Sequence, residues 1–361
     1  MSCADPSRNC RAGPPEPAAA GIFAEIARLQ RAGRRAVLAV PIWTSGSVPL
    51  GAHSKLLFRD DGSIKGTVGG GHLEAEVLAA AAVVLREDRH RVLEFDLTSA
   101  DAAQAGMICG GRCAVLLEPI APSRGADVFA AAAHAEVSGE PIVIMTILLS
   151  DAPPGKLALT SNRCLVGAGG DSQWADPLLE LAEESLSDGR PRFVEDPVCA
   201  LIYPILPRPS LLIFGAGHIG VCLAHLADIA GFRVVVADDR KEFANAERFP
   251  RADQVLVATV ADAFSQLQIA EDSYLVADTR GHASDEEVVA RGLATAAKYI
   301  GMIGSKTKVA TVRQRLRARG LPEKDIARLH APSGLDIGAE TVEEIAVSIL
   351  AQLIAVRRGV S

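Results

Sequence analysis

The glycine pattern GAGHIG at residues 215–220 constrains the fold of this 361-residue chain more than any other feature. It follows the apolar run LLIF and precedes residues with helical spacing, so a buried strand is expected before it and a helix after it. Gly215 permits a tight turn, Gly217 lets a phosphate approach the backbone, and Gly220 allows helix and strand to pack closely. The pattern therefore predicts the strand, turn and helix that begin a Rossmann-like fold.

The rest of the second half alternates apolar runs with helical patterns. Strict alternation requires crossovers between parallel strands, which predicts a doubly wound parallel sheet. Helices are expected between VVVADD and QVLVAT and over residues 342–357, where Thr341 and Glu344 form a capping box. We therefore predict a C-terminal Rossmann-like domain over residues 209–361, which begins after the proline-rich segment PILPRP.

The first half mixes helices and strands without this regular alternation. A helix is expected after residue 21, then a strand at 35–42, an irregular loop, and a hairpin in which Asp61 and Gly62 form the turn. Further strands are expected at residues 92–97, 114–120, 142–149 and 200–205. These patterns predict an N-terminal α+β domain over residues 21–205, preceded by a disordered tail over residues 1–20. The predicted fold class is thus α/β.

Composition and charge argue against several classes of function. The net charge is −7, whereas a general binder of nucleic acid is expected to be basic. The longest apolar stretches fall short of the ~18–20 residues that a membrane span needs, and the start of the chain lacks the apolar segment of a secretory signal. Seven scattered cysteines form no disulfide framework, which fits a reducing compartment. We therefore expect a cytoplasmic protein without nucleic-acid or membrane partners.

Three loops of the second half carry candidate ligand-binding residues, because the carboxyl ends of parallel strands line the ligand crevice. The N–H groups and the dipole at a helix start favour an anion there by roughly 0.3–2 kcal/mol. Asp238 ends the second strand, where dinucleotide folds place an acid near a ribose hydroxyl. The candidates are Gly215, Gly217, His218, Gly220, Asp238, Asp278, Arg280, His282, Gly304, Ser305 and Lys306. Two alternatives remain open: glycines that serve close packing alone, and loop charges that face solvent.

A run of three glycines in the first half is a further candidate. Gly69, Gly70 and Gly71 stand between a strand and a helix, so their N–H groups can turn toward an anion. His72 and Glu74 then lie in the first helical turn and join the candidate site. A hinge or a tight turn without a ligand is the alternative interpretation.

Cys109 is the candidate reactive residue, since Gly110 and Gly111 leave its thiol accessible. If nearby N–H groups or Arg112 lower its pKa from about 8.5, the thiolate becomes a nucleophile or a sulfur carrier; a packing role is the alternative. The spacing to Cys113 is not that of a zinc site, so no metal site is expected. Core positions are expected for Cys113, Cys164, Cys199 and Cys222.

Six ordered blocks resemble the xanthine dehydrogenase accessory family, the XdhC/CoxI-like proteins. The blocks are GSVPLGAHSKLLFRDDGSIKGTVGGGHLEAEV, MICGGRCAVLLEPI, LLIFGAGHIG, VVVADDRKEFANAERFP, YIGMIGSKTKVATVRQRL and HAPSGLDIGAETVEEIAVSIL. The resemblance covers nearly everything after residue 20 and is weak from about residue 121 to 208. Members of the family vary at the position after the three glycines, which His72 occupies here, so the resemblance does not require a thiol there.

The resemblance implies an accessory protein rather than an enzyme. Such a protein is expected to bind molybdopterin-bound molybdenum cofactor and to promote exchange of an oxo ligand for the terminal sulfido ligand, with sulfur from a cysteine desulfurase. It would then deliver the cofactor to an apo molybdenum hydroxylase of the xanthine dehydrogenase type. In this scheme the helix starts of the second half hold the phosphate or nucleotide tail. Cys109 relays sulfur, contacts molybdenum or only packs.

Two other functions fit the residues. The glycine pattern and Asp238 favour an NAD(P)-dependent oxidoreductase, although no convincing acid–base set accompanies the expected nicotinamide position. A ligand-sensing Rossmann module that only regulates a partner is the third hypothesis. A homodimer is compatible with the sequence, since Rossmann domains often pair.

Overall fold

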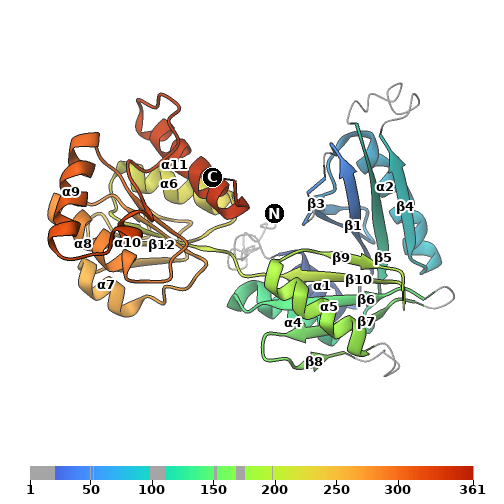
Figure 1. Ribbon diagram of the computed structural model, residues 1–361. Coiled ribbons are helices and arrows are strands. Elements are labelled where there is room, and N and C mark those ends of the chain that lie inside the picture. Colours follow the sequence, from blue (N-terminus) through green and yellow to red (C-terminus); the bar gives the residue numbers. More distant parts are fainter. Residues whose placement is uncertain are drawn as a thin grey trace, which may run out of the picture. The chain divides into compact units, whose positions relative to one another are not determined.

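The computed structural model describes residues 21–48, 50–51, 53–97, 110–149, 153–167, 175–196 and 198–360. Two compact units divide the chain between Pro207 and Arg208, and we call them the N-terminal and C-terminal units (Figure 1). The predicted tail over residues 1–20 and the candidate residue Cys109 lie outside the described residues. Within the described part of the chain, every helix is too short or too polar to cross a membrane.

The first sheet of the N-terminal unit is antiparallel and has the order β3-β2-β1-β5-β4. Its strands are β1 (Ala36–Gly46), β2 (Lys55–Arg59), β3 (Ile64–Thr67), β4 (Arg91–Asp96) and β5 (Gly111–Ile120). Apolar side chains of α2 (Gly71–Glu87) pack on one face, and those of α1 (Ile22–Arg31) pack on the other. Strand β1 runs past residue 42, where a loop was expected, because a bulge lets it stay paired with β5 as far as Gly46.

A second antiparallel sheet completes this unit, in the order β8-β7-β6-β10-β9. Its strands are β6 (Ile142–Ile147), β7 (Gly155–Thr160), β8 (Leu165–Val166), β9 (Arg192–Val194) and β10 (Ala200–Ile205). Helix α4 (Ala126–Ser138) joins α1 in a core shared by both sheets, and α5 (Ala175–Asp188) covers the other face. Only β6 and β10 of this sheet were expected from the sequence.

The C-terminal unit holds a six-stranded parallel sheet in the order β13-β12-β11-β14-β15-β16. The strands are β11 (Ser210–Phe214), β12 (Arg233–Asp238), β13 (Gln254–Val257), β14 (Ser273–Ala277), β15 (Tyr299–Met302) and β16 (Leu329–His330). Numbered along the unit, this is the order 3-2-1-4-5-6 of a Rossmann fold, as the alternation of strands and helices predicts. The fold class is mixed α/β, with an N-terminal α+β region.

Helices cover both faces of the parallel sheet (Figure 1). Helices α6 (His218–Ile229) and α11 (Val342–Arg358) pack together over one apolar cluster, and the predicted capping box of Thr341 and Glu344 begins α11. The other face carries α7 (Val260–Gln266), α8 (His282–Leu293), α9 (Lys306–Ala318) and α10 (Glu323–Ile326).

The prediction of a helix between β12 and β13 is wrong, because that segment contains only turns and bends. Asn245 bonds nearby backbone through its side chain, which competes with helical hydrogen bonds, and Pro250 follows. Two helices of this unit were not expected: α10, and α7 after β13, where the Thr259 hydroxyl accepts the N–H of Asp262 as an N-cap.

A buried ion pair joins the two sheets of the N-terminal unit. The ammonium of Lys156 on β7 lies 2.7 Å from a carboxylate oxygen of Glu118 on β5, and both side chains are 3% exposed. The same ammonium donates to the Thr146 hydroxyl and lies 5.0 Å from the ring centroid of Phe129. Loss of one partner would leave the other charge buried without compensation.

We expect Lys156→Met to lower the free energy of unfolding of this unit by about 3 kcal/mol, because it leaves the Glu118 carboxylate buried without its ion-pair partner. The double variant Lys156→Met with Glu118→Leu should recover most of the loss. Urea titration followed by tryptophan fluorescence checks this, because the two tryptophans of the sequence, Trp43 and Trp174, both precede residue 208. A single variant as stable as the wild type would contradict the prediction.

Candidate functional site

The carboxyl ends of four parallel strands bring the predicted loops of the C-terminal unit together. The hydrogen-bond ladder continues past each strand: Gly215 N–H donates to Ala237 at 2.8 Å, and Asp278 N–H donates to Phe214 at 2.8 Å. Strands β11 and β14 are neighbours, and the strand order reverses between them. Ligands of open α/β sheets bind at such a switch point, so the glycine pattern and the loop from Asp278 lie where a ligand is expected.

The three glycines of residues 215–220 have different structural roles. Gly215 has φ +125°, and a Cβ there would lie 2.0 Å from the carbonyl oxygen of Asp278. A Cβ at Gly220 would lie 2.5 Å from the Gly215 carbonyl oxygen. Gly217, the N-cap of α6, is different: a Cβ there would meet only an Asp278 carboxylate oxygen, at 3.7 Å. Packing therefore explains Gly215 and Gly220, whereas Gly217 is the position where a ligand can approach.

Asp238, at the end of β12, is bound closely by the protein itself. It accepts the N–H of Ala216 at 2.9 Å, the N–H of Arg240 at 3.0 Å, and two guanidinium N–H groups of Arg240 at 2.8 Å each. Burial opposes its ionisation, but the Arg240 side chain and the two backbone N–H groups prevail and lower the pKa of Asp238 to about 2. Arg240, which stacks over Phe243 at 3.8 Å, was not identified from the sequence, although it directly follows the strand-end acids.

Asp278, the first residue after β14, has a raised pKa, in contrast to Asp238. Burial, together with the Asp285 carboxylate, raises the pKa of Asp278 to about 7, against the opposing effects of the Gly220 N–H and the Lys308 ammonium. Asp238 adds a further repulsion. Among the described side chains, Asp278 has no ion-pair partner. Its carboxyl group thus lies at the first turn of α6 and is partly protonated near neutral pH.

Asp285 and Lys308 connect the loops after β14 and β15. The fully buried Asp285 carboxylate accepts the N–H and the hydroxyl of Thr279, at 2.8 and 2.7 Å, and pairs with the Lys308 ammonium. Lys308 also donates to the Ile303 carbonyl oxygen at 2.9 Å. Sequence reasoning missed both residues, because their pairing depends on how α8 and α9 pack together.

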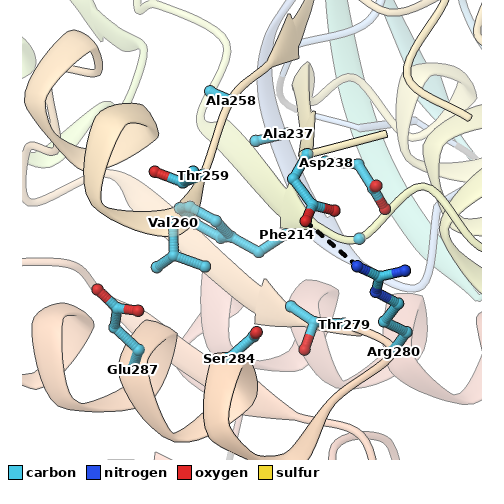
Figure 2. A pocket seen from close by; sticks show the side chains of 12 residues that line it. Phe214, Ala237, Asp238, Ala258, Thr259, Val260, Thr279, Arg280, Ser284 and Glu287 are labelled. Carbon is cyan, nitrogen blue, oxygen red and sulfur yellow. Dashed lines mark hydrogen bonds and ion pairs between the residues drawn. The ribbon is translucent and has the colours of Figure 1, made fainter. Parts of the chain in front are cut away.

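A cleft of about 240 Å³ opens beside these loops (Figure 2). Its lining comes from the ends of β11, β12, β13 and β14, from the start of α7, and from the first two turns of α8. The lining residues are Phe214, Gly215, Ala237, Asp238, Asp239, Ala258, Thr259, Val260, Thr279, Arg280, Ser284 and Glu287. Of the predicted residues, Gly215, Asp238 and Arg280 line this cleft.

The other predicted residues of this unit lie on the same edge of the sheet. His218, in the first turn of α6, is exposed. Ser305 caps α9 by accepting the Lys308 N–H at 3.2 Å, Lys306 is exposed beside it, and Gly304 precedes them. His282 is the first residue of α8.

In the N-terminal unit, the three-glycine turn surrounds a carboxylate of the chain itself. Gly69, Gly70 and Gly71 all have positive φ, and Glu74 accepts the N–H groups of Val68 and Gly70 at 3.1 and 3.3 Å. The Thr67 hydroxyl and these N–H groups hold the pKa of Glu74 below its usual value, although burial acts in the other direction. The neighbouring His72 is half-exposed and lies 2.8 Å from Glu76.

Gly110 and Gly111 lie where β1 and β5 meet. A Cβ at Gly111 would lie 2.5 Å from the Ser45 carbonyl oxygen, so close strand packing requires glycine there, while Gly110 is exposed. Burial raises the pKa of the Cys113 thiol to about 11, which fits a core residue.

The expected core positions of the other cysteines need correction: Cys164 is exposed, and Cys199 and Cys222 are only half-buried. Among the described residues, no group of three His, Cys, Asp or Glu side chains is placed to hold a metal ion.

This architecture defines a protein with an α+β N-terminal region and a Rossmann-fold C-terminal unit. A family model described as the XdhC Rossmann domain matches residues 211–353, and one described as the XdhC and CoxI family matches residues 29–96. The chain belongs to the XdhC and CoxI family.

Known relatives match nearly the whole chain. It is 28% identical over 328 residues to a probable xanthine dehydrogenase subunit of Bacillus subtilis, covering 90% of this chain and 94% of that protein. It is 27% identical over 340 residues to the uncharacterized protein YqeB of Escherichia coli, covering 94% of this chain but only 46% of YqeB. A crystal structure described as a xanthine dehydrogenase from Bacillus halodurans superimposes with a TM-score of 0.78 at 27% identity, covering 94% of this chain and 96% of that one.

Asp278 should make the stability of the C-terminal unit depend on pH. A carboxyl group whose pKa is higher in the folded than in the unfolded chain binds more protons when folded, so stability falls as pH rises from about 4 to about 7. We expect Asp278→Asn to be more stable than the wild type at pH 8, by about 1–3 kcal/mol after allowance for partial exposure, and to lose this advantage near pH 4.

Scanning calorimetry of the full chain at several pH values measures this difference. The exposed Asp336 supplies the control, since Asp336→Asn should follow the wild type throughout. If the stabilities of the wild type and Asp278→Asn change with pH in the same way, the pKa of Asp278 is not raised.

Proposed function

We propose that this chain is an accessory factor for a molybdenum hydroxylase of the xanthine dehydrogenase type, and that its cargo is the molybdenum cofactor. It would bind the cofactor, support its sulfuration and deliver it to the apo-enzyme, rather than catalyse a reaction of its own. Membership of the XdhC and CoxI family supports the maturation role. The observation that carries the cargo proposal is the convergence of the glycine pattern and two further loops on one cleft, at the switch point of the Rossmann sheet.

The charges at this site fit the phosphate end of such a cargo. Within the described chain, no protein group accepts the N–H groups of His218 and Ile219 in the first turn of α6, and Gly217 leaves room in front of them. Arg280 and Lys306 are exposed cations of the neighbouring loops. A phosphate bound there would gain the helix dipole and hydrogen bonds to free N–H groups.

Three acids near the glycine pattern do not cancel this attraction. Asp238 is neutralised by Arg240, and Asp285 is neutralised by Lys308. Asp278 has a pKa of about 7, so a large fraction of it is uncharged near neutral pH. These three carboxyl groups therefore add less negative charge than their number suggests, while Asp239 and Glu287 also line the cleft.

The proposed partners follow from the cargo. An apo-hydroxylase would receive the finished cofactor. A cysteine desulfurase would supply the sulfur as a persulfide; with two electrons from an external reductant its outer sulfur would enter as sulfide, and the oxo ligand would leave as water. Cys109 is the proposed sulfur relay, because it is followed by two glycines in the family block MICGG.

Gly217→Asp should abolish retention of the cofactor. The new carboxylate would stand at the N-cap of α6 and repel a phosphate, so we expect at least about tenfold less pterin to co-purify from cells that make molybdopterin. Fluorescence of the oxidised pterin released from the purified protein measures the effect. Ala296→Asp, which adds the same charge at an exposed position near the amino ends of the strands, is the control. Equal pterin content in both variants would refute the proposed cargo site.

Cys109→Ala should lower hydroxylase activity in the host while leaving the bound pterin unchanged, because it removes the sulfur relay but not the phosphate site. Cys164→Ala, which removes an exposed thiol, should change neither quantity. Full hydroxylase activity with Cys109→Ala would exclude the relay and favour a purely regulatory role.

A nicotinamide dinucleotide is the second candidate cargo, favoured by the Rossmann strand order and the cleft beside the glycine pattern. An NAD(P)-dependent oxidoreductase should bind NAD(H) or NADP(H) at micromolar concentration and transfer hydride. Binding without hydride transfer would argue for carriage rather than catalysis.

A further inference from the structure

We propose that the cleft of the C-terminal unit is a nucleoside site, selective for an unsubstituted ribose, and that the Asp239 carboxylate binds the ribose 2′- and 3′-hydroxyls. This inference rests on the proposed function and extends it, because it assigns a nucleotide-bearing ligand to the site that would hold the cargo. Its occupant is a nucleoside diphosphate or a larger molecule that contains one.

The size and lining of the cleft fit one nucleoside. Its volume of about 240 Å³ is below the roughly 300–1,000 Å³ of sites that enclose a complete ligand, so it would hold one end of a longer molecule. Phe214, Ala237 and Val260 offer apolar surface for a base, and Thr259 and Ser284 offer hydroxyl groups (Figure 2). Gly215 also lines the cleft, so a diphosphate attached to the nucleoside can continue along the glycine turn toward α6.

Two adjacent acids lie at the end of β12, where Asp238 is the last residue of the strand and Asp239 follows it, and their surroundings differ. The Asp238 side chain is 5% exposed and accepts four hydrogen bonds of 2.8–3.0 Å from Ala216 and Arg240. The Asp239 side chain is 51% exposed and lines the same cleft, and its ion-pair contacts among the described residues are long: 3.5 Å to Arg280 and 4.0 Å to Arg240. A ribose can therefore form hydrogen bonds to Asp239 without disrupting the fold. Binding to Asp238 would instead break the hydrogen bonds that hold the glycine turn.

Arg280 completes the charge pattern. Its guanidinium lies in the loop after β14, 3.5 Å from an Asp239 carboxylate oxygen. Hydrogen bonds from a ribose diol would satisfy Asp239, and Arg280 would then be free to contact the diphosphate. A phosphate on the 2′-oxygen would instead meet the Asp239 carboxylate, and Arg240 could not neutralise it without releasing Asp238. The site therefore favours the free diol.

The nucleobase distinguishes two candidate ligands of this site. A nicotinamide dinucleotide would present adenosine, whereas a dinucleotide form of the proposed cargo would present another nucleoside. Calorimetric titration of the full chain with ADP, GDP and CDP should show which base binds best, and stronger binding of GDP or CDP than of ADP would point to the cargo. In each case the 2′-deoxy form of the best ligand should bind about tenfold more weakly, because the Asp239 carboxylate loses a hydrogen-bond donor. This comparison needs no variant.

The variant test uses Asp239→Asn, with Asp336→Asn as the control for loss of an exposed acid. We expect Asp239→Asn to bind the best diphosphate about tenfold more weakly and to lose its preference for ribose over 2′-deoxyribose. For the same reason, NAD should bind the wild type at least about tenfold more tightly than NADP, and Asp239→Asn should narrow that ratio.

The results can overturn this inference without overturning the proposed function. Equal affinity for ribose and 2′-deoxyribose, tighter binding of NADP than of NAD, or no effect of Asp239→Asn would refute the assignment of Asp239. Absence of binding by all three diphosphates would refute the nucleoside site. If Gly217→Asp still releases the pterin in either case, the cargo proposal survives. If the pterin content is also unaffected, both proposals fail.

Discussion

Backbone N–H groups at the glycine-rich turns of both units are bound by carboxylates of the chain itself, and the candidate site depends on this interaction. Asp238 accepts the Ala216 N–H, and Glu74 accepts the Gly70 N–H. These bonds hold each turn in the shape that glycine permits, but they place negative charge where an anionic ligand would bind. Arg240 removes that charge at Asp238. Affinity for an anion in the C-terminal unit is therefore set by the balance of carboxylates and cations, and the glycines alone do not determine it.

The sequence predicts most of the C-terminal unit, because its four central strands, β12, β11, β14 and β15, are largely buried on both faces and appear as continuous apolar runs. The exceptions include the segment between β12 and β13, where Asn245 and Pro250 outweigh a helical pattern, and α7, which follows β13. The N-terminal unit is harder to predict. In its antiparallel sheets, β7 carries the charged Lys156, which is buried because it pairs with Glu118 from the other sheet and donates to Thr146 on β6.

The candidate site is predictable where a residue acts through its own loop, and not where it acts through a distant partner. The loop that begins at Asp278 was found because strand ends line the ligand crevice of a parallel sheet. Asp285 and Lys308 were not found, because a buried ion pair between two helices leaves no periodic or spacing signal in the sequence. A glycine pattern also does not distinguish packing from binding. The structure makes that distinction, since backbone crowds Gly215 but leaves Gly217 accessible.

The two acids at the end of β12, Asp238 and Asp239, show that a shift of one residue along the chain changes which side chain is assigned to the ligand. Successive side chains along an extended segment point in opposite directions, so two adjacent acids at a strand end face different surroundings. Asp238 faces the glycine turn and becomes part of its support, while Asp239 faces solvent and the cleft. Counting residues from the first glycine leads to the supporting acid, because that count measures distance along the chain and not side-chain direction. Exposure and existing hydrogen bonds then decide which carboxylate can exchange a protein contact for a ligand hydroxyl, and here that carboxylate is Asp239.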